Sequence, residues 1–336
     1  MNTIDISWKS LWRILFMFAL AVVLYLTLDI LVILFLAIVI SSAIDAPITY
    51  LEKKKIPRIL GTLIIFLAVL LVLAILLYIV IPVALVELDN FFSSLYKLKI
   101  PEFFGTNISK SVKSFLVKTQ NLSGLLLSGS ASFFDIITEV LGNVIIVVTT
   151  LVLSLYLAIN RDGVEKFLRA ILPRNYEDYV IDVYLRVRKK MGLWLQGQLI
   201  LSLIIAILVF IGSWVLGIKY GLILGILAGF FELVPYIGPI ITGAVVILVA
   251  IKESFMLGVY ALALFIIIQQ IENHILTPLV MKKTVGISPV VVVIALLAGT
   301  QLAGFVGLIL AVPVAVVLQE LVEDFSERKL KARDAK

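Results

Sequence analysis

The chain of 336 residues contains no cysteine and one histidine, and only 15% of its residues are charged. Without cysteine it can form neither a disulfide nor a zinc-thiolate site, so its fold does not depend on the redox state of a compartment. His274 stands alone, no H-E-x-x-H sequence occurs, and no serine stands in a nucleophile-elbow context. We therefore expect no enzyme activity, no metal site and no cofactor.

Hydrophobic residues, in contrast, make up 62% of the chain and give it a mean hydropathy of +1.16. This composition is far from that of soluble domains and predicts an all-α polytopic membrane protein. The net charge of +6 is carried by short basic clusters beside apolar runs, where lysine and arginine orient membrane helices. We expect the lipid bilayer as a partner and no nucleic acid. The first apolar run lacks a small-residue cleavage site and is predicted to be a helix, not a signal peptide.

Apolar runs and their interruptions predict the order of segments along the chain. A hairpin over residues 11–44, turning at Thr27–Asp29, and a third span from Ile59 to about Val86 form an N-terminal scaffold. Pro173 is predicted to break a pair of amphipathic surface helices, and a fifth span follows at 193–216. The predicted segments are the scaffold 1–86, an amphipathic extracytoplasmic segment 87–135, a fourth span 136–160, amphipathic cytoplasmic helices 161–191, two repeats 192–253 and 254–322, and a charged cytoplasmic tail 323–336.

Lysine and arginine near the ends of the spans predict the orientation in the membrane. Lys9, the basic runs at 53–58 and 161–190, and the basic tail all fall on one side if both termini are cytoplasmic. Five lysines within 97–118 fall on the other side, but a long external segment is translocated largely regardless of its charge. We therefore expect a multi-pass protein with both termini in the cytoplasm.

Two apolar stretches, 217–252 and 286–322, match each other at a spacing of 69 residues, and each is interrupted near its middle. The match places Glu232 over Gln301, with similarity of composition alone as the alternative explanation. Each repeat comprises one helix and one broken hairpin, an odd number of crossings, so the repeats are predicted to be inverted. Arms of about 15 residues rise only about 22 Å, less than the hydrocarbon core of about 30 Å. We therefore expect re-entrant hairpins whose tips meet near the midplane.

The two interruptions supply candidate residues for a solute or ion pathway. Glu232 precedes a break at which prolines and a glycine free backbone groups, and a carboxylate inside a membrane is by default a functional candidate. The alternative is that Glu232 only locks the hairpin tip. Glu272 is predicted to project toward the repeat interface, or else to pair with Lys282 or Lys283. The candidates are Glu232, Pro235, Tyr236, Gly238, Pro239, Gln269, Glu272, Asn273, Gln301, Gly304 and Gly307, with Gln196 and Gln198 on an access path.

At these positions the chain resembles the AI-2E family of autoinducer-2 exporters, also described as a family of bacterial permeases. The resemblance is strong over 190–322 and weaker before that. Many members have a histidine before a proline where this chain has Ser288 before Pro289, so a mechanism that gives that histidine a proton does not transfer. The motifs that carry the resemblance are L-W-L-Q-G-Q (193–198), E-L-V-P-Y-I-G-P (232–239), Q-Q-I-E-N-H-I-L-T-P (269–278), G-I-S-P (286–289) and G-x-x-G-L-I-L-A-V-P (304–313).

The resemblance implies a homo-oligomeric protein of the bacterial inner membrane, with a pentamer as one arrangement, that exports a small hydrophilic molecule such as autoinducer-2. Some relatives are described as sodium/proton antiporters. We predict an inverted-repeat secondary transporter that exports a small polar solute and uses H⁺ or Na⁺ as the coupling ion. The alternatives are a cation/proton antiporter that uses Glu232 or Glu272, and an oligomeric membrane scaffold that transports nothing.

Overall fold

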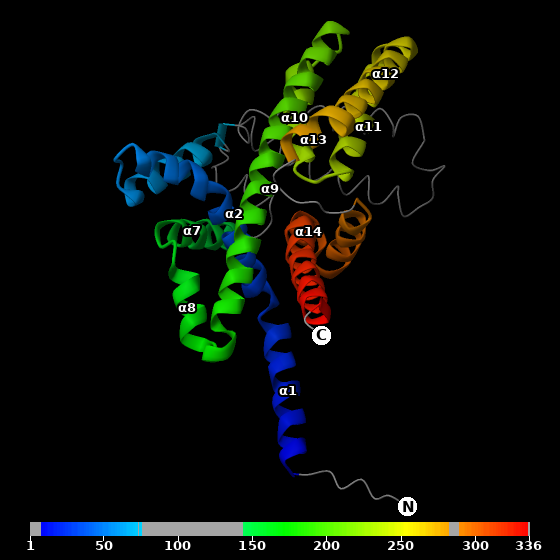
Figure 1. Cartoon of the computed structure of the whole chain (residues 1–336). Coiled ribbons are helices and arrows are strands. Elements are labelled where there is room, and N and C mark those ends of the chain that lie inside the picture. Colours follow the sequence, from blue (N-terminus) through cyan, green and yellow to red (C-terminus); the bar gives the residue numbers. More distant parts are fainter. Residues whose placement is uncertain (1–7, 73, 76–143, 282–288, 335–336) are drawn as a thin grey trace, which may run out of the picture.

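The computed structural model describes residues 8–72, 74–75, 144–281 and 289–334. These residues form helices and no strand (Figure 1). Four of the helices are long and apolar enough to cross a membrane, and a fifth crossing results if the bent pair Ile145–Ile159 and Gly163–Ile171 counts as one. The prediction of an all-α polytopic membrane protein is confirmed. The predicted extracytoplasmic segment 87–135 lies outside the described residues.

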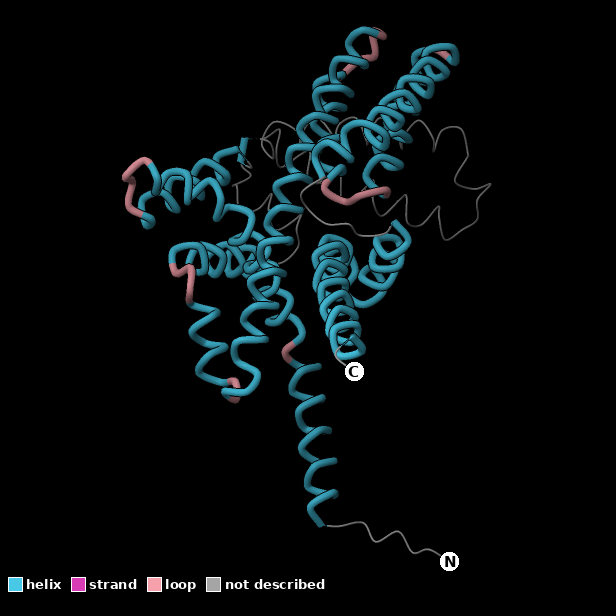
Figure 2. Tube along the Cα trace, viewed as in Figure 1, coloured by secondary structure: helices cyan, strands magenta, loops and turns pink. Residues whose placement is uncertain are grey.

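The first two helices, α1 (Trp8–Leu26) and α2 (Leu28–Lys53), follow one another almost without interruption. The amide of Thr27 donates to the carbonyl of Val23, and the amide of Leu31 donates to that of Thr27, each over 3.0 Å. The Thr27 hydroxyl also donates to the Val23 carbonyl, as threonine does inside helices. The predicted hairpin turn at Thr27–Asp29 is therefore wrong, and in Figure 2 α1 leads away from α2 without folding back.

A small core joins α2 to a helix over Arg58–Val72 and to α7 (Val144–Ile159). Each of the three helices contributes one buried side chain to this core. Ile48, Phe66 and Ala158 are these residues. The two partners of α2 lie within the predicted third and fourth spans, so segments about 100 residues apart in the sequence form one helical scaffold.

The next two helices are α8 (Gly163–Ile171) and α9 (Arg174–Val215). The chain bends by 87° between α7 and α8. The break predicted at Pro173 is confirmed, because Pro173 has extended backbone between the helices. The predicted separation of a surface helix ending at 191 from a span starting at 193 is wrong, since α9 runs through both as one helix of 42 residues. Only Gly192 stands at that point, and one glycine costs a helix about 1 kcal/mol, too little to end it.

The C-terminal half of α9 packs against α10 (Gly221–Glu232), α11 (Ile237–Glu253) and α12 (Phe255–Ile271). These helices gather around the upper part of α9 in Figure 1. Their core is entirely apolar, and its fully buried members include Val209, Ala228, Val246 and Ala261. The interruption predicted after Glu232 is confirmed as the break between α10 and α11.

The last helix, α14 (Pro289–Asp334), bends back on itself at Gly304, which has φ of 56°. Its two arms are Val290–Leu302 and Val306–Ser326. In a straight helix, residues 299 and 307 would lie about 12 Å apart. Here a side chain at Gly299 would collide with the carbonyl of Gly307, so the arms pack against each other. The predicted second interruption is therefore also present.

Candidate functional site

Two buried carboxyl groups meet beside the break of the first hairpin. Glu232 is the last residue of α10, and Glu272 is the first residue of a π-helical turn, Glu272–Leu276, that follows α12. Their side chains are neighbours, and the residues are only 2% and 7% exposed. Two neighbouring buried carboxyl groups can hydrogen-bond to each other only if one of them carries a proton, because carboxylates without a proton only accept. The arrangement can therefore hold a proton.

Two amide side chains complete the polar site. Gln269 precedes Glu272 by about one turn, and its Nε2 donates to Glu272 Oε2 over 2.7 Å. Gln198 of α9 is 2% exposed, and its Nε2 donates to the backbone carbonyl of Glu232 over 2.5 Å. Buried polar groups are costly unless they are hydrogen-bonded, and here each amide has a partner. The site thus joins α9, the end of α10 and the end of α12.

The π-helical turn decides which side chains reach this site. The amide of Thr277 donates to the carbonyl of Glu272, five residues earlier, which is the π pattern. Pro278 is the second residue of α13 (Thr277–Met281), and the wider turn relieves the clash of its ring with the carbonyl of the preceding turn. Glu272 is buried but Asn273 is exposed. Of the predicted group Gln269, Glu272 and Asn273, the structure brings only the first two together.

The tip of the first hairpin is a strained turn. Tyr236 has φ of 64° and ψ of −46°, and the amide of Ile237 donates to the carbonyl of Pro235 over 2.8 Å. This is a γ-turn of the rare kind with positive φ. A side chain at Gly238 would collide with the backbone carbonyl of Phe231, so the turn closes only around a glycine. Such strain is typical of functional sites, and the Pro-Tyr-x-Gly spacing is its signal in the sequence.

The second hairpin meets the first through its arms. Val234, at the first tip, is buried with Leu296 and Ala311, which belong to opposite arms of α14. Gln301 and Gly304, near the bend of α14, are exposed and lie outside this cluster. The hairpins therefore contact each other, but not tip to tip as predicted, because the first tip packs against the arms of α14 and the second tip, with Gln301, is exposed.

Gln196 and Gln198 lie on different sides of α9, because residues two apart on a helix differ by about 200° in direction. Gln198 reaches Glu232, whereas Gln196 Nε2 donates to the carbonyl of Ala43 in α2 over 2.5 Å and lines a cleft there. The two glutamines therefore do not line one access path. The other predicted pathway residues are buried (Pro239, Gly307), half-buried (Pro235, Gln269) or exposed (Tyr236, Asn273, Gln301, Gly304).

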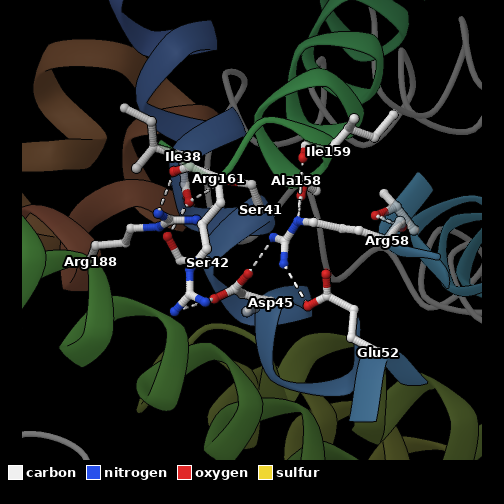
Figure 3. Close-up of polar contacts among 12 residues, drawn as sticks. Ile38, Ser41, Ser42, Asp45, Glu52, Arg58, Ala158, Ile159, Arg161 and Arg188 are labelled. Atoms are coloured by element: carbon white, nitrogen blue, oxygen red, sulfur yellow. Dashed lines mark hydrogen bonds and ion pairs between the residues drawn. The ribbon is translucent and has the colours of Figure 1, made fainter. Parts of the chain in front are cut away.

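An ionic network near the end of α2 has no counterpart in the predictions. The guanidinium of Arg58 donates to Asp45 over 2.6 Å, to Glu52 over 3.1 Å and to the carbonyl of Ala158 over 2.9 Å (Figure 3). The last of these contacts satisfies a carbonyl at the C-terminal end of α7. In the sequence, Arg58 belongs to a basic run that predicts orientation only. The carbonyl of Ala158 belongs to a residue 100 positions after Arg58. At that separation, a hydrogen bond leaves no pattern in the sequence that could predict it.

A second ionic network joins α9 to the second arm of α14. Arg186 donates to Glu320 and to Asp324, each over 2.6 Å. Lys190 contacts Glu320 and also lies 3.0 Å from Glu323. Glu320 is only 4% exposed although it is charged. These pairs fasten the second hairpin to the part of α9 that precedes its apolar half.

Several known proteins are similar to this chain. A family model described as AI-2E family transporter matches residues 14–327. YueF of Bacillus subtilis is 26% identical over 291 residues, covering 81% of this chain and 78% of YueF. A Mycobacterium tuberculosis protein is 27% identical over 332 residues, covering 93% of this chain and 88% of its own. YhhT of Escherichia coli is 29% identical over 143 residues, covering 41% of this chain and 40% of YhhT. All three carry the names of transport proteins.

Proposed function

The chain belongs to the AI-2E transporter family, and from this premise we propose that it is a proton-coupled secondary transporter that exports a small hydrophilic solute. Autoinducer-2 is the solute that the family resemblance suggests. The observation that carries the proposal is the pair of buried, neighbouring carboxyl groups of Glu232 and Glu272. Ionisable groups inside membrane proteins are expensive and are typical of proton and substrate pathways.

The chemistry of the site suits coupling. A proton shared between two carboxyl groups can pass to water when the groups separate, since hydration then stabilises the carboxylate that forms. Gln198 holds the backbone at Glu232, and Gln269 holds the side chain of Glu272, so the two carboxyl groups belong to elements that can move apart. The γ-turn at Tyr236 stores strain at the joint between α10 and α11. In the proposed cycle, a polar solute that enters between the groups displaces the proton.

The proposed frame for this cycle is a pair of inverted, re-entrant hairpins that move relative to the scaffold. α10 has 12 residues and so rises about 18 Å, which is short of a hydrocarbon core of about 30 Å and favours a re-entrant arm. The contact of Val234 with both arms of α14 lets the hairpins move as one unit. Both termini lie in the cytoplasm of a bacterial cell in this proposal, and the protein assembles as a homo-oligomer in the inner membrane.

Transport by the reconstituted full chain tests the proposal. Vesicles loaded with autoinducer-2 and a pH-sensitive dye report solute efflux and proton movement together. Glu232→Gln and Glu272→Gln should each slow proton-coupled efflux by about tenfold or more, since a hydrogen bond of a charged group is worth about 1.5–3 kcal/mol. The matched control is Glu253→Gln at the end of α11, whose carboxylate lies 3.8 Å from Lys219. If both site variants insert normally and export at the control's rate, the proposal fails and a non-transporting scaffold gains support.

A second candidate is a cation/proton antiporter that uses the same carboxyl pair. It is favoured by the oxygens that gather there: the two carboxyl groups and the backbone carbonyl of Glu232. Oxygen ligands of this kind suit Na⁺, a hard cation. Adding sodium to vesicles without organic solute separates the candidates. Only an antiporter should then move protons, and Glu253→Gln should leave that response intact.

A further inference from the structure

An open polar cleft lies between α2 and the N-terminal half of α9. Its volume is about 770 Å³, and the basic side chains that line it are Lys53, Arg161, Arg188 and Lys189. Asp45 is the one carboxylate among its lining residues. None of these residues belongs to the carboxyl pair of the proposed transport site, so the cleft needs an explanation of its own.

The charges of the cleft do not balance. Asp45 already accepts from Arg58 over 2.6 Å and lies 3.7 Å from Arg161 (Figure 3). Among the described residues, Lys53 and Lys189 form no ion pair within 4 Å, and both are exposed. The cleft therefore presents surplus positive charge around a hollow, which concentrates anions there.

The buried guanidinium of Arg188 is the feature of the cleft that most favours a bound anion. Arg188 is only 9% exposed, and its Nη1 donates to the backbone carbonyl of Arg161 over 2.9 Å. Within the described part of the chain, no carboxylate lies within 4 Å of its guanidinium. A buried charge without a counter-charge is costly, whereas a guanidinium beside a hollow has the planar set of donors that phosphate oxygens accept.

We propose that this cleft binds a phosphate-bearing anion, with Arg188 as the buried contact and Lys53 and Lys189 at the rim. Two sources share this chemistry: the headgroup of an anionic phospholipid and a soluble phosphate ester. Both fit the position beside α8 and α9, on the side that the basic runs predict to be cytoplasmic, where anionic headgroups attract lysine and arginine. The anion completes the ion pairing where α2, the α7–α8 corner and α9 converge.

Calorimetric titration of the full chain in an uncharged detergent at about 0.15 M salt tests the proposal and distinguishes the sources. One arm uses dihexanoyl phosphatidylglycerol, with dihexanoyl phosphatidylcholine as the zwitterionic comparison. The other uses glycerol 3-phosphate, with glycerol as the uncharged comparison. Binding of phosphatidylglycerol alone assigns the cleft to lipid, and binding of glycerol 3-phosphate as well assigns it to phosphate esters in general.

Three variants connect binding to the cleft. Arg188→Gln should weaken binding by about tenfold or more, and Lys53→Gln and Lys189→Gln by about threefold each. Lys166→Gln, which removes the same charge from the exposed face of α8, should change affinity by less than about twofold. If Arg188→Gln does not fold, the two lysine variants decide, since both side chains are exposed. Absence of binding in both arms overturns the proposal, as does binding that the cleft variants weaken no more than Lys166→Gln does.

Discussion

Removing Arg186 should loosen the second hairpin from α9. Its guanidinium donates to Glu320 on α14 and to Asp324 one turn later, each over 2.6 Å. Arg186→Met keeps much of the length and apolar stem of the side chain and removes these contacts. Glu320, which is 4% exposed, then retains Lys190 as its basic partner.

The magnitude follows from the burial of the two partners. Breaking a fully buried ion pair by removing one member costs about 3–5 kcal/mol, because the other charge stays buried. The Arg186 side chain is 37% exposed, so solvent screens part of the interaction, and Lys190 compensates for another part. We therefore expect Arg186→Met to lower the free energy of unfolding by about 1–2 kcal/mol.

Thermal unfolding of the purified protein in detergent measures this loss. The matched control is Arg169→Met, because Arg169 also contacts several carboxylates, including Glu165 over 3.0 Å and Glu177 over 2.7 Å. Those pairs are exposed to solvent, so the control should unfold like the parent protein. The double variant Arg186→Met with Glu320→Met should recover much of the loss, since the most buried carboxylate is then gone and Asp324 keeps Arg328 at 3.1 Å. Equal losses in Arg186→Met and Arg169→Met, or strict additivity in the double variant, would refute the reasoning.

Three further substitutions probe the backbone, two at the site and one after α2, each followed by thermal unfolding. Gly238→Ala should destabilise by about 1–3 kcal/mol, because the added methyl group meets backbone atoms that cannot turn away. Gly163→Ala, whose methyl group would meet its nearest side-chain atoms at 3.4 Å, should be tolerated, and equal losses would contradict this account. Gln198→Leu should cost about 1–3 kcal/mol by leaving a buried carbonyl unpaired. Lys55→Gly should stabilise by about 0.5–1 kcal/mol, since Lys55 follows the C-cap of α2 with φ of 68°, whereas Lys54→Gly, at φ of −87°, should not.

The sequence predicts the hairpin breaks well because their causes are local. Pro235 and Gly238 leave few conformations open to the chain, and the strained turn forms between them. Gly304 ends the first arm of α14 through a positive φ that other residues rarely adopt. The predicted turn at Thr27 is wrong because this segment has no proline or glycine to break the helix. The Thr27 hydroxyl instead donates to the carbonyl of Val23, one turn earlier in the helix.

The pairing of residues across elements is not local, and the sequence does not predict it. Glu232 and Glu272 are each candidates on the grounds of burial in an apolar run, but 40 positions separate them, and only packing brings their carboxyl groups together. Arg186 and Glu320 lie 134 positions apart. Each looks like an ordinary charged surface residue in its own segment. Asn273 is the opposite case. Regular helical spacing predicts that it reaches the site, but the π-helical turn leaves it exposed.

The unbroken course of α9 has a mechanical consequence. Gln198 lies beside the carboxyl pair and Arg186 lies at the ionic contact with α14, so 12 residues of rigid helix, about 18 Å, connect the two. A rod that tilts at one end displaces its other end. Any rocking of α10 that carries α9 with it must therefore strain or break the salt bridges between α9 and α14. Those salt bridges oppose the tilt of α9 until they break.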